Sequence, residues 1–467
     1  MLFNSIDFAI FLPLVFLIYW GFFGRSLKGQ NAFLLLASMV FYGWWDWRFL
    51  GLVFISAAID YVVAITLDGT ENDRKRKLLL ATSMIANLGM LAFFKYFDFF
   101  ISSFTDSFML FGRPINSSTL NIVLPVGISF YTFQTMSYTI DVYRRQMKAT
   151  RDWVAFGAYI LFFPQLVAGP IERGTQLLPQ FHKLRPFNEK SARDGLRQML
   201  WGLFKKVIVA DNCAFYADQI FGNEANHYGG ALVLGVVLFA FQIYADFSGY
   251  SDIAIGAARL FSIDLMRNFN YPYFSRDIGE FWRRWHISLS TWFRDYLYIP
   301  LGGSKGTKIF VARNVMIIFL VSGLWHGANW TYVAWGALNG LLFLPLILSK
   351  KHRGHTGPIA PGRMLPSIME FLHILLTFFL ICLTWVFFRA TSMEMAFNIF
   401  CEIFSPSLFQ EPPGTMPGLR LTILLSVCFM LIVEWMQREK QHGLQDILTF
   451  SRPVRWSAYL AICTILI

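Results

Sequence analysis

Two histidines in aromatic surroundings stand out as candidates for acid–base chemistry. His326 lies in the stretch SGLWHGANW, between two apolar runs, and His286 lies in the charged stretch 276–305. A neutral imidazole can accept a proton and later return it, because its ordinary pKa lies near working pH. A histidine at membrane depth can equally be a hydrogen-bonded structural residue. From the residues alone, packing and catalysis explain His326 about equally well.

Two acidic residues, Asp246 and Asp252, interrupt the otherwise apolar stretch 242–261. Carboxylates at membrane depth are costly and usually face a bundle interior or a water-filled cavity. They could form a proton relay or line a substrate tunnel, and Trp325, beside His326, is assigned to the same lining. The alternative, slightly favoured, is that the two acids pair with nearby arginines and hold the fold together.

The stretch 276–305 is too charged to cross a bilayer. On a helix of about 100° per residue its Trp and Tyr side chains form one stripe, which predicts a single amphipathic helix in the membrane plane. His286 falls at the edge of the stripe, with Arg283 and Arg294 just beyond it and Arg284 on the opposite side. Such a helix could deliver His286 to a cavity in the bundle.

Long apolar runs dominate the chain of 467 residues, which is 55% hydrophobic and only 15% charged. A soluble domain carries about 25% charged residues. The clearest runs are 8–23, 32–41, 52–67, 78–94, 230–244, 309–324, 333–348, 371–388 and 419–435. Less continuous runs occupy 120–140, 153–169, 245–261 and 454–467. Since a helix needs roughly 20 residues to cross the hydrocarbon core, we predict about ten to twelve membrane segments in an all-α, polytopic transmembrane helical bundle.

Two of these runs bracket the first histidine. The runs 309–324 and 333–348 place His326 at a break between two helices. Gly323 and Gly327 flank it, and glycine permits close approach of the backbone.

Short basic loops separate many of the runs. They contain Arg25 and Lys28, then 74–77, 144–151, 350–353 and 438–440. The positive-inside rule places these loops in the cytoplasm and the N-terminus outside. The stretch 172–206 is also basic, so the run 153–169, interrupted by Pro164 and followed by Pro170, is interpreted as a re-entrant or half-crossing segment. Anionic lipid accounts for the positive charge, so membrane lipids rather than nucleic acid are the expected partners.

No repeat or low-complexity linker divides the chain, which predicts a single membrane domain over 1–467. Its parts are N-terminal spans (8–140), an irregular re-entrant and amphipathic region (141–230), a catalytic core (231–349) and C-terminal spans (350–467). The run 454–467 is short for a span, which leaves open whether the native chain extends beyond Ile467. The five cysteines show no paired spacing, and no metal site is predicted.

Six stretches between residue 1 and about 340 match the motifs of one known family in their order along the chain. They are MLFNSIDFAIFLPLVFLIYW, LLLASMVFYGWW, GPIERG, QIYADFSGYSDIAIGAARLFSIDLMRNFNYPY, EFWRRWHISLSTWFRDYLYIPLGGS and SGLWHGANWTYVAWGALNG. On these residues the chain resembles the membrane-bound O-acyltransferases (MBOAT). Within them it is most similar to the bacterial subgroup of alginate and polysaccharide O-acetyltransferase membrane subunits, which is related to the teichoic acid D-alanyl transferases.

The resemblance implies a central tunnel, entered by an acyl donor from the cytoplasm and by an acceptor from outside. The family's near-invariant histidine maps onto His326 and its second polar position onto His286. His326 would then be the general base that takes the proton of a sugar hydroxyl as it attacks an acyl thioester. His286 would orient the donor carbonyl or stabilise the oxyanion.

Four basic residues are candidates for binding a phosphate-bearing donor, such as acetyl-CoA or a pantetheine-linked carrier. They are Arg283, Arg284, Arg294 and Lys305. Lipid headgroups explain these charges equally well.

The resemblance therefore implies an O-acyltransferase of the bacterial inner membrane with no bound cofactor. It would move an acyl group, expected to be acetyl, to hydroxyls of an extracytoplasmic polysaccharide or its carrier protein, aided by a separate extracytoplasmic acetyltransferase subunit. Transfer of D-alanyl or another acyl group is one alternative. A transporter would predict an internal repeat, which the sequence lacks. A non-catalytic scaffold would predict that changing His326 leaves ester formation intact.

Overall fold

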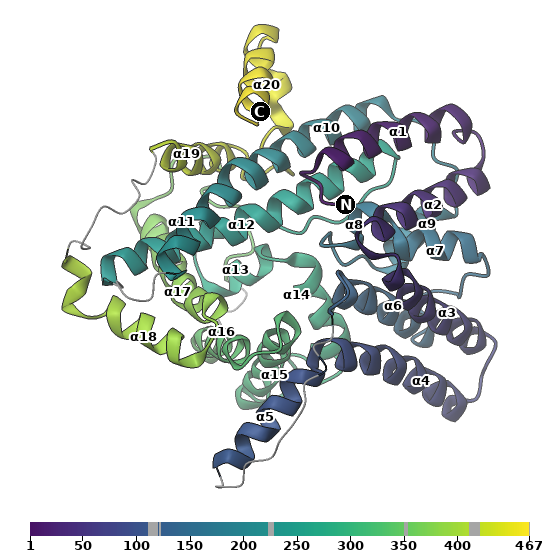
Figure 1. The fold of residues 1–467 in the computed structure, drawn as a ribbon, viewed down its shortest axis with the longest axis horizontal. Helices are drawn as coiled ribbons and strands as arrows, with labels where there is room; N and C mark the ends of the chain where they lie inside the picture. The colour runs from purple at the N-terminus through teal and green to yellow at the C-terminus, as the bar shows by residue number, and fades with distance from the viewer. Residues whose placement is uncertain (111–119, 121–122, 223–227, 350–353, 411–420, 467) are drawn as a thin grey trace. The chain divides into compact units, whose positions relative to one another are not determined.

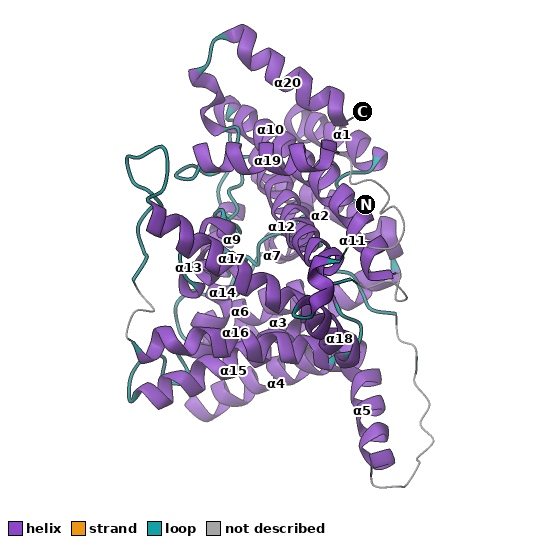
Figure 2. Ribbon diagram, turned by 90° about the vertical axis from the view of Figure 1, so that its left-hand side faces the viewer, coloured by secondary structure: helices purple, strands orange, loops and turns teal. Residues whose placement is uncertain are grey.

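The computed structural model describes residues 1–110, 120, 123–222, 228–349, 354–410 and 421–466. The predicted basic loop 350–353 and the last residue of the chain lie outside these ranges. Within them the chain consists of helices and loops, without strands (Figure 2). The all-α prediction is confirmed.

Six helical segments of the described ranges are long and apolar enough to cross a membrane, so the protein is a multi-pass membrane protein. They are Arg48–Asp68, Asp73–Thr105, Gly229–Leu260, Lys308–His326, Trp330–Leu348 and Ile368–Arg389. Two shorter apolar helices are α1 (Ile6–Phe22) and α19 (Leu421–Met436).

Fewer helices reach spanning length than the ten to twelve predicted segments. Four predicted runs form helices of only 15–17 residues, namely α1, α19 and the helices Ile128–Tyr143 and Arg452–Leu466. Two other differences concern how runs are joined or divided. The runs 230–244 and 245–261 join into one helix of 32 residues, α12 (Gly229–Leu260). The run 153–169 is divided into the short helices α7 (Trp153–Leu161) and α8 (Phe163–Leu166). Pro164 stands in the first turn of α8, where proline is tolerated, so the predicted interruption is present.

The chain folds into two compact units, each described by itself. The first comprises Met1–Ala192 and Ala257–Met266, and the second comprises Arg193–Gly256 and Arg267–Ile467. The single membrane domain expected from the sequence stays a prediction. Both candidate histidines belong to the second unit.

Buried polar contacts join the helices of the first unit. Besides α1, α7 and α8, this unit contains the helices α2 (Leu27–Asp46), α3 (Arg48–Asp68), α4 (Asp73–Leu91), α5 (Phe97–Leu110), α6 (Ile128–Tyr143) and α9 (Gly174–Phe181). The carboxylate of Asp60 on α3 accepts hydrogen bonds from Asn87 on α4 (2.8 Å) and from Thr139 on α6 (2.9 Å). A separate carboxylate, Glu172, accepts the backbone N–H of Met266 at 2.6 Å. These two buried carboxyl groups thus have hydrogen-bond partners, as their desolvation requires.

The second unit contains α15 (Lys308–His326) and α16 (Trp330–Leu348), which lie side by side in Figures 1 and 2. It also contains α19 and most of α12, together with most of α10 (Glu189–Leu203) and all of α11 (Asp211–Gly222), α17 (Ile368–Arg389), α18 (Met393–Ile403) and α20 (Arg452–Leu466). Thr307 caps α15 by accepting the N–H of Phe310, and Asn329 caps α16 by accepting the N–H of Thr331. The break predicted between these two helices is confirmed.

The single amphipathic helix predicted over 276–305 is wrong. The stretch forms α13 (Ile278–Arg284), α14 (Ile287–Phe293) and the π-helical segment η5 (Arg294–Tyr298). His286 stands at the break between α13 and α14 with φ +44°, in the left-handed region. Loop residues replace the helical hydrogen bonds: Asn270 N–H donates to the carbonyl of Arg284, and the carbonyl of Asn268 accepts the N–H of Ile287. Helical periodicity carries no information about these long-range bonds.

Candidate active site

His326 is the last residue of α15 and lies half-buried among aromatic rings. Its ring centroid lies 5.0 Å from that of Trp325, 5.1 Å from that of Trp335 on α16 and 5.2 Å from that of Phe388 on α17. All three contacts are edge-to-face. Three rings from three helices therefore fix the plane of the imidazole.

Two glycines bring the next helix against His326, as the sequence predicts. A Cβ atom at Gly323 would collide with the backbone carbonyl of Tyr332, and one at Gly327 would collide with the Tyr332 ring. Tyr332 in turn packs edge-on against Phe388, with ring centroids 4.9 Å apart. The absence of side chains at these glycines thus permits the close contact between α15 and α16.

His286 is buried, with 1% of its surface exposed. Its ring packs edge-on against Phe247 of α12 at 4.7 Å and lies 6.1 Å from Trp325. Its Nδ1 lies 3.1 Å from Oδ1 of Asn268. Burial lowers the pKa of His286 well below its ordinary value, and the charge of His326 lowers it further.

Both histidines therefore contact the same tryptophan ring. Trp325, predicted to line a tunnel, is buried and contacts the rings of His326 and of His286. Residues 40 positions apart are brought together because α15 returns beside the break between α13 and α14. The arrangement places two proton-accepting groups in surroundings of low polarity, where electrostatic interactions are strong.

The two acids of α12 pair with lysines, which corrects the prediction of arginine partners. Lys205 Nζ lies 2.6 Å from Asp252, and Lys206 Nζ lies 2.5 Å from Asp246. Gln198 Nε2 also donates to Asp252 at 2.8 Å. Both lysines lie on the π-helical segment η2 (Phe204–Ala210), which the sequence pattern does not reveal. These contacts support the structural interpretation of the acids, and their place in a tunnel lining stays a prediction.

The four candidate donor-binding residues have different environments. Arg284 is buried and forms an ion pair with Glu280 at 2.9 Å. Arg283 is exposed and donates to the backbone carbonyl of His355, and Arg294 is exposed and pairs with Asp295 at 2.7 Å. Lys305 is exposed in the turn before α15.

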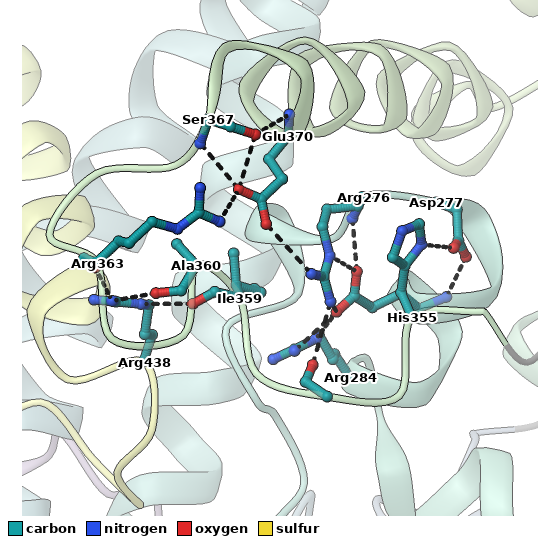
Figure 3. Close-up of polar contacts among 12 residues, drawn as sticks. Arg276, Asp277, Arg284, His355, Ile359, Ala360, Arg363, Ser367, Glu370 and Arg438 are labelled. Carbon is teal, nitrogen blue, oxygen red and sulfur yellow. Dashed lines mark hydrogen bonds and ion pairs between the residues drawn. The ribbon is translucent and has the colours of Figure 1, made fainter.

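Figure 3 shows a polar network that sequence reasoning missed. Glu280 accepts from both Arg276 and Arg284, and Arg276 also lies 3.6 Å from Glu370. Glu370 pairs with Arg363 and completes a capping box with Ser367 at the start of α17. The Ser-x-x-Glu spacing before an apolar run could have revealed the cap, whereas the long-range pairs have no local signature. This network joins α13 to the segment that precedes α17.

Sequence reasoning also missed Asn268 and Ser288, which surround His286. Ser288 Oγ donates to Oδ1 of Asn268 at 2.9 Å. The only local signal is a polar RNFN segment after a long apolar helix. No group of three or more His, Cys, Asp or Glu side chains within the described ranges is placed to hold a metal ion.

Comparison with known proteins identifies the family. Residues 148–390 match the model described as "MBOAT, membrane-bound O-acyltransferase family". A protein of Azotobacter vinelandii named "Probable alginate O-acetylase AlgI" is 40% identical over 407 residues, which cover 87% of this chain and 78% of that protein. The "Peptidoglycan O-acetyltransferase" of Helicobacter pylori is 36% identical over 432 residues, covering 85% and 79% respectively.

A more distant relative, the "Teichoic acid D-alanyltransferase" of Streptococcus thermophilus, is 32% identical over 248 residues, covering 49% of this chain and 58% of that protein. The family match includes His286, Trp325 and His326, the residues that the structure brings together. The chain therefore belongs to the membrane-bound O-acyltransferase family and is an O-acyltransferase.

Proposed function

We propose that this protein transfers an acetyl group from a cytoplasmic thioester donor to hydroxyls of a cell-envelope polysaccharide or of its carrier. The observation that carries the proposal is the contact of Trp325 with both His326 and His286 inside the family-matched segment. The names of the relatives at 36–40% identity, an alginate O-acetylase and a peptidoglycan O-acetyltransferase, favour acetyl as the group and a polysaccharide as the acceptor. D-alanyl transfer is less favoured, because the D-alanyltransferase relative aligns with about half of the chain.

His326 acts as the general base in this proposal. The acceptor hydroxyl attacks the thioester carbonyl, and His326 takes the hydroxyl proton as the new C–O bond forms. The C–S bond then breaks, and the departing thiolate receives a proton, returned by the imidazolium. General-base help of this kind contributes about 10²–10⁴ in rate. The edge-to-face contacts around His326 hold the ring in place for the transfer.

Enzymes of this family use an acyl donor, and we assign that role to acetyl-CoA or a pantetheine-linked carrier. Arg294 and Lys305, which are exposed, suit the phosphates of such a donor better than Arg284, which is held by Glu280. A charged donor stays in the cytoplasm while its carbonyl reaches the site, so acceptors outside can be esterified without exporting it. This topology has the N-terminus outside, in the bacterial inner membrane, with an extracytoplasmic subunit that passes the group to the polymer.

The test is the O-acetyl ester content of the host's surface polysaccharide, measured by NMR. The cells compared carry, as their only copy of this protein's gene, either the wild type or the His326→Ala variant. The two proteins are compared at equal amounts of membrane-inserted material. We expect a loss of ester of about 10²-fold or more. His373→Ala is the matched control, because His373 is an exposed histidine on α17 of the same unit, and it should leave ester content unchanged. Ester retained by folded His326→Ala would overturn the proposal and favour a scaffold.

A further inference from the structure

The hydrogen bonds around Asn268 determine which nitrogen of His286 carries the proton. We propose that Asn268 holds His286 in the Nδ1–H tautomer, so that Nε2 carries the lone pair and His286 accepts a hydrogen bond, rather than donating one, at the active site. Asn268 is then a positioning residue for the transfer reaction. This inference rests on the proposed function only for its catalytic consequence, since the tautomer itself follows from the contacts.

The backbone N–H of Ser288 determines which end of the Asn268 side-chain amide is the oxygen. The backbone N–H of Ser288 lies 3.3 Å from the Oδ1 position, and a backbone N–H can only donate. The atom at that position must therefore be the carbonyl oxygen. The other side of the amide, Nδ2, donates to the hydroxyl of Ser251 on α12 at 3.2 Å. Both ends of the amide are thus accounted for.

The same carbonyl oxygen faces the imidazole. Oδ1 of Asn268 lies 3.1 Å from Nδ1 of His286. Because Oδ1 can only accept, Nδ1 must supply the hydrogen, and in a neutral imidazole the other nitrogen then has no proton. Ser288 Oγ lies 3.4 Å from Nδ1 but only 2.9 Å from the same Asn268 oxygen. Its single hydrogen is therefore donated to Oδ1, and Nδ1 keeps its own hydrogen.

Asn268 is anchored firmly enough to impose this choice. It is fully buried, and its own carbonyl accepts the N–H of Ile287, the residue after His286, at 2.8 Å. Ser251, its partner on α12, precedes Asp252, which is fixed by its ion pair with Lys205. Asn268 therefore holds both the ring of His286 and the left-handed backbone at the break.

The tautomer changes the chemistry open to His286. An oxyanion is stabilised by groups that donate hydrogen bonds. With Nδ1–H committed to Asn268, a neutral His286 presents a lone pair at Nε2 and cannot donate from it. Burial of the ring also opposes a second proton. His286 therefore serves the reaction as a hydrogen-bond acceptor at Nε2, and the oxyanion role expected from the family resemblance falls to other donors.

The direct test is ¹⁵N–¹H NMR of the full-length protein in lipid bilayers with only its histidines labelled with ¹⁵N. Signals of His286 are identified by their loss in His286→Gln. Wild type should show a bonded proton at Nδ1 and a bare Nε2. Asn268→Ala should move the population toward Nε2–H, whereas Asn268→Asp, which keeps an acceptor at Oδ1, should retain Nδ1–H. A proton at Nε2 in wild type would overturn the inference.

A matched control separates this effect from the cost of losing any buried asparagine. Asn87 in the first unit is also fully buried, and its amide accepts from Ser56 Oγ and donates to Asp60. Asn87→Ala should lower thermal stability but leave the His286 signals unchanged. A shift of those signals in Asn87→Ala as large as in Asn268→Ala would overturn the assignment to Asn268.

The catalytic consequence is tested by transfer of label from [¹⁴C]acetyl-CoA into the polysaccharide fraction of host membranes. At equal amounts of folded protein, Asn268→Ala should be slower by about 10²-fold or more, the scale of loss when a catalytic histidine takes the wrong tautomer. Asn268→Asp should lose less activity than Asn268→Ala, and Asn87→Ala should transfer label at the wild-type rate. Equal losses in the Ala and Asp variants of Asn268, or wild-type rates in both, would contradict a positioning role. Failure of wild type to transfer label would exclude acetyl-CoA as the donor, and full activity of His326→Ala would overturn His326 as the general base. Either result would leave the tautomer assignment standing.

Discussion

At the residue scale, the two histidines differ in what surrounds them. His326 is half-buried and held by ring edges, whereas His286 is fully buried and held by Asn268. Rings position an imidazole without choosing its tautomer, but a carbonyl oxygen at Nδ1 chooses it. The two residues are of the same type, so their different surroundings must account for any difference in their roles in the reaction.

The ion pair between Lys205 and Asp252 allows a prediction at the same scale. The Lys205 side chain is 3% exposed and also lies 3.8 Å from Glu434, so Lys205→Met would leave two buried acids without their cation. We expect a loss of about 3–5 kcal/mol in the free energy of unfolding, measured by denaturant titration in mixed micelles.

The adjacent lysine is the control for that measurement. Lys206 pairs with Asp246, whose side chain is 50% exposed, and with Asp211. Lys206→Met should cost no more than about 1 kcal/mol, because solvent screens exposed pairs. Equal losses in the two variants would show that burial does not set the strength of these pairs.

At the scale of elements, the packing of α15 on α16 places His326. Gly323 lies so close to the carbonyl of Tyr332 that even a methyl group would force the helices apart. The same contact sets the approach of Trp335 to the imidazole. The position of His326 is thus a property of a helix pair.

Gly323→Ala should therefore reduce both stability and activity. We expect a loss of about 1–3 kcal/mol in the free energy of unfolding, as for other insertions into packed interiors, together with lower acetyl transfer by the protein that remains folded. Gly89→Ala on α4 is the control, because a Cβ there would meet no atom within 4 Å. Similar damage from both substitutions would argue that helix flexibility, rather than the close contact with Tyr332, is what matters.

At the scale of the whole molecule, each compact unit is assembled from segments distant in the sequence. The second unit joins 193–256 to the chain after Arg267 and contains both histidines. The first unit also includes residues 257–266, which follow in the chain after part of the second unit. Glu172 binds the end of this segment by accepting the N–H of Met266. This carboxyl lies outside the candidate spanning helices, in the GPIERG motif.

The buried carboxyl group of Glu172 should make the stability of the folded protein depend on pH. Burial raises its pKa from 4.5 to about 8, with a partly opposing effect from Met266 N–H and Arg173. The folded state therefore binds this proton more tightly than the unfolded state. The resulting contribution to stability is fully present below pH 4.5, declines above it and is lost as pH rises through about 8.

We expect the melting temperature of the wild-type protein to fall between pH 6 and pH 9, and Glu172→Gln to reduce that fall. The glutamine keeps an oxygen that can accept Met266 N–H but has no proton to lose. Melting curves of both proteins at the two pH values provide the measurement. An identical fall in both would exclude Glu172 as its source.

The sequence by itself determined the all-helical membrane class, the break at His326, the possibility of close backbone approach at Gly323 and Gly327, and the family. These features depend on hydropathy, on local turns and on residue identity in contiguous motifs, all of which are local properties of the chain. It also indicated His286 and His326 as the catalytic candidates, a role that stays a proposal.

Only the tertiary structure decided the remaining features. It ends α13 before His286, gives Asp246 and Asp252 lysine partners, and sets Trp325 against both imidazoles. It also places Asn268 at Nδ1 of His286. Each of these outcomes depends on hydrogen bonds or packing between segments far apart in the chain, and such contacts can override a local helical pattern without leaving a trace in its periodicity.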